Sequence, residues 1–127
     1  MFEVEVSRRF RATHAIILDG VWEDLHEHDW GVWAMLRGEA LDSEHLLIDF
    51  HALEQALASI VKPFEGATFN GTPPFDNIVP TAERVAEFVG QRLDCVVPDG
   101  VVIHGIAIEE APGCIARWYP QTTACVE

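Results

Sequence analysis

The sequence predicts an α+β fold in which an antiparallel sheet is covered on one face by two helices. Three observations predict it: long alternating segments near the N-terminus, two amphipathic segments grouped in the middle, and a strand–turn–strand pattern near the C-terminus. The expected order is strand, strand, helix, helix, strand, strand (ββααββ). The 127 residues contain no repeat, linker or break in composition, so residues 1–127 are expected to form a single domain.

The first two strands are predicted from the alternation of apolar and polar residues. Residues 2–14 carry mainly apolar side chains and His14 on one parity and charged side chains on the other, which is typical of a strand with one buried face. A second strand is expected over about residues 26–40, with two histidines and four apolar residues on one face. The connection between the strands includes an Asp-Gly pair and is expected to extend to Asp24.

Two helices are expected to follow. Asp49 is a suitable N-cap for a helix through Val61, whose apolar positions form one stripe before a proline ends it. Residues 63–79 are rich in glycine and proline and are expected to be irregular. Thr81 is a suitable N-cap for a second helix, which is expected to run to about Leu93.

The last two strands, residues 101–110 and 114–119, are separated by only three residues and are expected to form a hairpin. Glu110 shares the parity of the apolar residues Ile106 and Ile108. A carboxylate on an apolar face needs a partner or a ligand, because burying it unpaired is costly. The alternative is that Glu110 reaches solvent at the end of the strand, beside Glu109.

The composition excludes several function classes. The formal net charge is −13, which repels phosphate backbones and anionic lipids, so neither nucleic acid nor a membrane is an expected partner. No apolar run is long enough for a membrane span, and the first ten residues are charged rather than signal-like. The three cysteines include no CxxC pair, which favours the reducing cytoplasm. They are Cys95, Cys114 and Cys125.

Three of the six histidines form a pattern that suits a metal. His26 and His28 are two residues apart on a predicted strand and therefore project from one face, and His14 ends the neighbouring strand on its apolar parity. Three imidazoles that leave a fourth position open are the ligand set of a catalytic zinc site. The alternative is that they are ordinary core or surface histidines. The remaining histidines are expected to be solvent-facing or hydrogen-bonded structural residues: His45, His51 and His104.

Five segments, in order, resemble motifs of the 6-pyruvoyltetrahydropterin synthase / 6-carboxytetrahydropterin synthase superfamily, whose fold is the T-fold, or tunnelling fold. The family patterns are FxAxH, HGHNY, MVxDFxxL, PTxEN and VxVxETP. The matching segments are RFRATH (9–14), LHEHDW (25–30), LLIDFHAL (46–53), VPTAE (79–83) and IAIEEAP (106–112). Together they cover about residues 2–119.

The resemblance implies a site and an assembly. It implies a zinc ion held by three histidines and a pterin ring anchored by Glu110, with Thr81 and Glu83 near the pterin. It also implies a homo-oligomer, a hexamer made of two stacked trimers, in which active sites lie between subunits. The implied zinc ligands are His14, His26 and His28.

The sequence departs from the family at the catalytic residues. The family's cysteine before the first histidine of HGH is absent, since residues 1–94 contain no cysteine and Trp22 lies four residues before His26. The family's Asp-His pair is replaced by Glu65, which is kept as a candidate catalytic residue, and by Gly66. Loss of a positioned general acid/base lowers the rate about 10²–10⁴-fold. We therefore expect a divergent pterin-binding homologue that does not perform the standard synthase reaction.

An alternative prediction rests on Glu23. A side branch of the family carries an ExxHGH motif and cleaves the side chain of dihydroneopterin to give 6-hydroxymethyl-dihydropterin. Residues 23–28 fit this spacing, with Glu27 in place of glycine, so Glu23 is a candidate general base in a zinc-dependent lyase. Otherwise Glu23 is a loop charge that aids solubility. Glu27 is expected either to reshape the zinc site or to point to the opposite face of the strand.

Three of the eight basic residues lie within four positions, at Arg8, Arg9 and Arg11. They are either a cationic site for a phosphorylated pterin or partners of acidic residues, for example Glu3 or Glu5 across a subunit interface.

Overall fold

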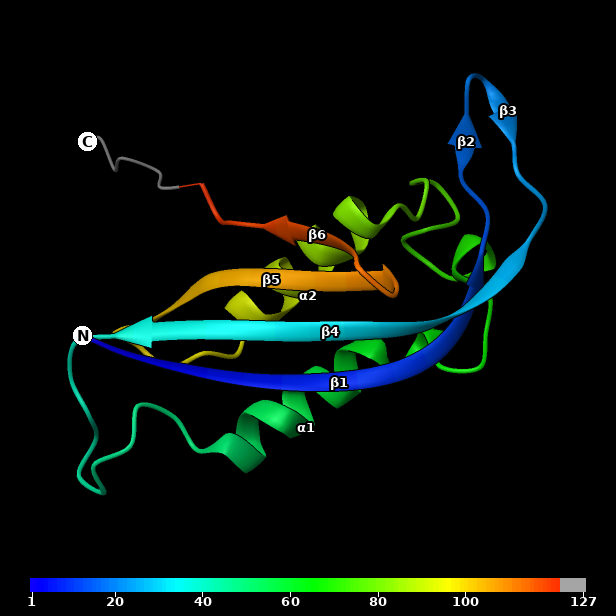
Figure 1. The fold of residues 1–127 in the computed structure, drawn as a ribbon. Coiled ribbons are helices and arrows are strands. Elements are labelled where there is room, and N and C mark those ends of the chain that lie inside the picture. The colour runs from blue at the N-terminus through cyan, green and yellow to red at the C-terminus, as the bar shows by residue number, and fades with distance from the viewer. Residues whose placement is uncertain (122–127) are drawn as a thin grey trace.

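A four-stranded antiparallel sheet with the strand order β1-β4-β5-β6 is the framework of the protein (Figure 1). The computed structural model describes residues 1–121. The strands are β1 (Phe2–His14), β4 (His26–Gly38), β5 (Val101–Ala111) and β6 (Cys114–Trp118). The predicted antiparallel sheet, the order of the main elements along the chain and the final hairpin are confirmed. β4 ends at Gly38, before the expected Ala40, because its pairing with both neighbouring strands stops at that residue.

Two helices cover one face of this sheet, as predicted (Figure 1). They are α1 (Phe50–Val61) and α2 (Ala82–Asp94). Both predicted N-caps are confirmed: Asp49 accepts a hydrogen bond from the backbone N–H of His51, and Thr81 accepts one from that of Arg84. The apolar stripes of the helices pack against the inward-facing residues of β1, β4 and β5, and this layer is the hydrophobic core.

The connection after His14 contains a short hairpin that the sequence analysis did not anticipate. Its strands are β2 (Ile17–Leu18) and β3 (Val21–Trp22), and they project from the end of the sheet opposite the N-terminus (Figure 1). Asp19 and Gly20 connect them with φ angles of 51° and 79°, the left-handed conformation that a tight two-residue hairpin turn requires.

The segment expected to be irregular contains two short 3₁₀ helices, η1 (Lys62–Phe64) and η2 (Phe69–Gly71). Between them, the chain runs beside the last residues of β1. The backbone N–H of Gly66 donates to the carbonyl of Arg11 at 2.7 Å, and that of Thr13 donates to the carbonyl of Ala67 at 2.9 Å. These bonds hold the end of β1, where His14 lies.

Within residues 1–121, no helix has the length and apolarity needed to cross a bilayer. Cys95 and Cys114 are exposed and free. The third cysteine, Cys125, lies outside the described residues.

Candidate metal centre

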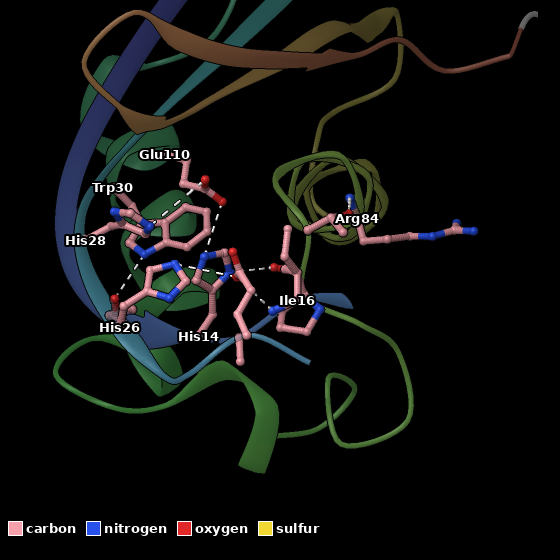
Figure 2. A network of polar contacts seen from close by, with 12 residues as sticks. His14, Ile16, His26, His28, Trp30, Arg84 and Glu110 are labelled. Carbon is pink, nitrogen blue, oxygen red and sulfur yellow. Dashed lines mark hydrogen bonds and ion pairs between the residues drawn. The ribbon is translucent and has the colours of Figure 1, made fainter. Parts of the chain in front are cut away.

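The register of β1 against β4 brings the three predicted histidines together. His14 pairs directly with His26, and Ala12 pairs with His28. Residues two apart on a strand project from the same face, so all three imidazoles lie on the buried side of the sheet at its far end (Figure 2). The ring centroids lie 4.6–5.2 Å apart. The convergence predicted from the HxH spacing is therefore confirmed.

Backbone carbonyl groups orient two of the rings. His14 Nδ1 lies 2.8 Å from the carbonyl oxygen of Pro80, and His26 Nδ1 lies 2.9 Å from that of Asp24. A carbonyl oxygen can only accept a hydrogen bond, so each Nδ1 carries the proton and donates. The Nε2 lone pairs of both rings are then free for a ligand, the arrangement in which histidines bind metals.

The inward-facing nitrogens fit a metal ion. His14 Nε2 and His28 Nε2 are buried and have no hydrogen-bond partner. Buried polar atoms without a partner are rare, and an ion is one of the standard explanations. The ligand atoms of the three histidines lie within 4.8 Å of one another. Burial lowers the pKa of His14 below its usual value, which favours the neutral, metal-binding form of the ring.

Glu110 lies at the same site. Its Oε1 is 3.2 Å from His14 Nε2 and its Oε2 is 4.0 Å from His28 Nε2 (Figure 2). The register of β5 against β6 shifts between Glu109 and Ala111, and such an irregularity re-aims side chains. The sequence left two alternatives for Glu110, a buried partner or solvent at the end of the strand. The structure shows the first, because the carboxylate contacts His14 and His28.

A second carboxylate flanks the histidines from the other side. Glu23 Oε1 lies 3.8 Å from His26 Nε2 and accepts a hydrogen bond of 3.2 Å from the backbone N–H of Ile16. Glu23 is thus held by the backbone next to the candidate metal position. Glu27 points to the opposite face of β4, where its carboxylate pairs with Arg11 at 2.8 Å, so it does not reshape the site.

An aromatic side chain forms the inner wall of the site. Trp30 is fully buried, and its ring contacts His14 and His28 edge-on at centroid distances of 4.8 and 5.8 Å. Its indole Nε1 donates to the carbonyl of Ala12 at 3.1 Å. Behind it lies Phe69 from η2, at a centroid distance of 5.1 Å. The imidazole rings therefore pack against a buried aromatic layer, which restricts the rotation of their side chains.

Thr81 and Glu83 lie at the start of α2, next to the site along the chain. The carbonyl that orients His14 belongs to Pro80, the residue before Thr81. Thr81 and Glu83 line a cavity of about 370 Å³, whose other lining residues are Arg84, Glu87 and Trp118. The side chain of Arg84 extends away from the histidines (Figure 2). Thr81 thus directly follows a residue that contacts His14, but the cavity that Thr81 and Glu83 line includes neither Glu110 nor any of the three histidines.

Glu65 lies elsewhere. Its carboxylate pairs with Arg8 at 3.2 Å, and both residues line a cavity with α1. The next residue, Gly66, has a φ of +69°, a conformation that favours glycine. Within the described part of the chain, Glu65 is not one of the groups that converge with the histidines.

The three clustered arginines pair with acidic residues of the same chain. Arg8 pairs with Glu65, Arg9 with Glu109 at 2.9 Å, and Arg11 with Glu27. The predicted alternative of ion pairing is thus found, although the partners are intramolecular and are neither Glu3 nor Glu5. The hydrogen bond from Arg9, followed by one from the backbone N–H of Gly113, holds the pKa of Glu109 below its usual value.

The other histidines lie outside the site. His51 is exposed near Glu54, His104 contacts the ring of Tyr119, and His45 lies in an exposed turn. Within residues 1–121, only the predicted trio forms a group that could hold a metal ion.

Sequence reasoning missed three groups that support the site. They are the carbonyls of Asp24 and Pro80 and the side chain of Asn70, which bonds to the backbone of Ala15. A carbonyl carries no residue-specific signal, although Pro80 lies within a recognised segment. Asn70 lies four residues after Gly66, in the same loop as the two residues that replace the family's Asp-His pair, and this position was the one signal available.

The fold and the site define a class of protein: an antiparallel α+β protein that gathers three histidines and a glutamate at one end of its sheet. The chain belongs to the 6-pyruvoyl tetrahydropterin synthase family, whose model matches residues 3–121. No curated protein sequence matches it significantly.

Solved structures share the fold and confirm the T-fold prediction. The 6-pyruvoyl tetrahydropterin synthase of Caenorhabditis elegans has a TM-score of 0.82 at 20% identity, covering 94% of this chain and 96% of that one. A catalytic-residue variant of the Plasmodium vivax enzyme has a TM-score of 0.75 at 16% identity, covering 94% and 98%. An uncharacterized Wolinella succinogenes protein has a TM-score of 0.68 at 16% identity, covering 95% and 100%. At these identities the likeness concerns the fold.

Proposed function

We propose that this protein binds zinc through His14, His26 and His28 and holds a pterin that Glu110 anchors. The observation that carries this proposal is the pair of buried, unpartnered Nε2 atoms of His14 and His28 beside a third histidine. Three imidazoles, two of which have oriented Nδ1–H groups, suit zinc, and membership of the family adds independent support. When bound, zinc supplies Lewis acidity that polarises a ligand oxygen.

The pterin part of the proposal rests on Glu110. A carboxylate can accept two parallel hydrogen bonds from the 2-amino group and the ring N–H of a pterin, which fixes the orientation of the ring. Glu110 lies at the inner end of β5 beside the histidines, so a ring anchored there reaches the metal position with its substituent. Thr81 and Glu83 are proposed to lie near the pterin, at the start of α2, because family membership implies it and Thr81 follows Pro80, which contacts His14.

We do not expect the standard synthase reaction. The two positions that match the family's Asp-His pair hold Glu65, which pairs with Arg8, and Gly66, which has no side chain to move a proton. No cysteine lies in residues 1–94. The chain therefore lacks the groups that the family uses for its proton transfers, and binding without standard turnover follows.

A second candidate function is supported by the position of Glu23. In this proposal, the protein is a zinc-dependent lyase that cleaves the side chain of a dihydropterin. The Glu23 carboxylate lies 3.8 Å from His26 Nε2, where it can take a proton from a ligand hydroxyl group next to the metal. In the Plasmodium vivax enzyme, the catalytic residue substituted in two solved variants is a glutamate, which adds support.

We also propose a homo-oligomer, a hexamer of two trimers. The sheet ends in β1 and β6, each with one edge that has no strand partner within residues 1–121. Such edges pair readily with another chain, and three copies joined in this way would close a barrel. Sedimentation of the purified protein tests this directly, and a monomer at micromolar concentration would contradict it.

Elemental analysis and pterin binding test the main proposal. The wild type is expected to carry one equivalent of zinc and to bind biopterin or dihydroneopterin. His26→Ala is expected to lose the zinc, while His51→Ala, a change at an exposed histidine, keeps it. A wild type without zinc, purified under conditions that retain metals and then supplied with zinc, would contradict the metal part.

The two functions differ in turnover. If dihydroneopterin is bound and recovered unchanged, the binding function is supported. If 6-hydroxymethyl-dihydropterin is formed, and Glu23→Gln abolishes its formation while Asp24→Asn does not, the lyase is supported. Asp24 is a suitable control because it is the exposed neighbour of Glu23 and has a carboxylate of its own.

A further inference from the structure

The carboxylate of Glu110 lies next to two of the three candidate metal ligands, His14 and His28. Its two oxygens are 3.2 and 4.0 Å from the Nε2 atoms of His14 and His28. The histidine ligand atoms themselves are separated by distances up to 4.8 Å. The carboxylate is therefore as close to two of the nitrogens as the three histidines are to one another (Figure 2).

The contact between Glu110 and His14 is suited to a cation that lies between the two groups. The Nδ1 of His14 donates to Pro80, so a neutral His14 ring presents a lone pair at Nε2. A carboxylate oxygen 3.2 Å away also presents lone pairs, and the two repel unless a proton or a metal cation lies between them. Glu110 has no hydrogen-bond partner among residues 1–121, so its oxygens are available to such a cation.

We infer that Glu110 is a fourth protein ligand of the metal when the pocket contains no pterin, and that a pterin displaces it. This inference rests on the proposed function, because it uses the same metal and the same pterin. Zinc binds carboxylate oxygen and imidazole nitrogen at similar distances, and four protein ligands would close a site that three leave open. One carboxylate cannot coordinate the metal ion and anchor the pterin ring at the same time. Pterin binding therefore removes Glu110 from the metal and leaves the fourth position open.

Glu23 is the rival carboxylate. Its oxygen lies 3.8 Å from only one histidine nitrogen, that of His26, and accepts the backbone N–H of Ile16. Glu110 contacts two histidines and is not held by the backbone. The geometry therefore assigns the fourth position to Glu110, and both residues can be tested in the same experiment.

Cobalt(II) binding measures the ligand set without any activity. Wild type, Glu110→Gln, Glu109→Gln and Glu23→Gln are titrated with Co²⁺ against a chelator, and visible spectra are recorded. Glu110→Gln is expected to raise the dissociation constant at least about tenfold, as losses in a metal site's ligand shells do, and to change the spectrum. Glu109→Gln is the matched control, because Glu109 pairs with Arg9 on the other face of β5. It is expected to bind like the wild type, and so is Glu23→Gln.

Biopterin tests the displacement. Its addition to the cobalt-loaded wild type is expected to shift the spectrum toward that of Glu110→Gln, and to have a smaller effect on Glu110→Gln itself. The infrared carboxylate bands of the wild type, compared with and without metal, provide a measurement that needs no variant. A coordinated glutamate shifts these bands on metal addition, and biopterin reverses the shift.

The outcomes separate the two proposals. Equal affinity and identical spectra for wild type and Glu110→Gln would overturn the fourth ligand and leave the three-histidine site standing. Loss of affinity in Glu23→Gln alone would overturn it in favour of Glu23. Bound biopterin that leaves the cobalt spectrum unchanged would overturn the displacement. No cobalt or zinc binding by the folded wild type would overturn the proposed function and this inference together.

Discussion

The side-chain amide of Asn70 hydrogen-bonds to both backbone polar groups of Ala15, its Oδ1 accepting from the N–H and its Nδ2 donating to the carbonyl, each at 2.9 Å. Ala15 is buried and directly follows His14. Asn70 therefore fixes the backbone directly after His14, the histidine that β1 contributes to the site.

Asn70→Ala is expected to destabilise the protein and weaken its metal site. The change leaves two buried backbone groups of Ala15 without these partners, and an unsatisfied buried group costs about 1–3 kcal/mol. The free energy of unfolding by urea and the dissociation constant for Co²⁺ measure the two effects. Asn77→Ala, a change at an exposed asparagine nearby, is the control. Equal stability and affinity of both variants would show that the Asn70 bonds have no such role.

Trp30→Phe is expected to lower stability by about 1–3 kcal/mol, because it removes buried volume and the donor to a backbone carbonyl. The indole is fully buried and bonds to the carbonyl of Ala12. Trp22→Phe removes the same atoms from a side chain that is 54% exposed, and is expected to change stability by less than about 0.5 kcal/mol. Urea denaturation of both variants checks the difference, and similar losses would contradict the buried role of Trp30.

Gly90→Ala is expected to be destabilising, although alanine in a helix is ordinarily more stable than glycine by about 0.5–1 kcal/mol. A Cβ at Gly90 in α2 would overlap the indole ring of Trp118 from β6. Overpacking of this kind typically costs about 1–3 kcal/mol, which exceeds the gain in helix propensity. Gly71→Ala is the control, since a Cβ there meets nothing within 4 Å. Thermal unfolding of both variants measures the effect, and a rise in the melting temperature of Gly90→Ala would refute the packing argument.

The main elements could be predicted because their sequences repeat with the period of the structure they form. The alternation over β1 and the HxH spacing in β4 place the histidines on one face, and the parity of Glu110 along β5 places it on the same face. Each of these predictions needs only the two-residue period of a strand.

The ion pairs and the backbone contacts of the site could not be predicted, because many chemically similar groups far apart in the chain compete for the same partner. Arg9 pairs with Glu109 and Arg11 with Glu27, out of 21 acidic residues, and composition cannot rank these partners. The carbonyl of Pro80 orients His14 from 66 positions away, through a group that every residue has. The β2–β3 hairpin was also missed, although its Asp-Gly turn is a recognised signal, because its strands are only two residues long each.

The free energy of unfolding of the metal-free protein is expected to decrease as the pH falls below about 6.5, because the imidazole of His14 is buried. Burial is the main cause that lowers the pKa of His14 from its usual value of 6.5. Between the lowered folded-state pKa and about 6.5, the unfolded chain binds a proton at this residue and the folded protein does not. Acid therefore favours unfolding there, by up to about 1.4 kcal/mol per pH unit for one proton.

Urea denaturation of the metal-free protein at a series of pH values measures this slope. His14→Gln, which keeps a side-chain donor for the carbonyl of Pro80, is expected to flatten the slope below pH 6.5. His51→Gln changes an exposed histidine whose nearest acid is Glu54 at 3.5 Å, and is expected to keep the wild-type slope. Identical slopes for wild type and His14→Gln would mean that the imidazole of His14 becomes protonated in the folded protein as readily as in the unfolded chain. The buried, neutral ring that a metal requires would then not be its resting form.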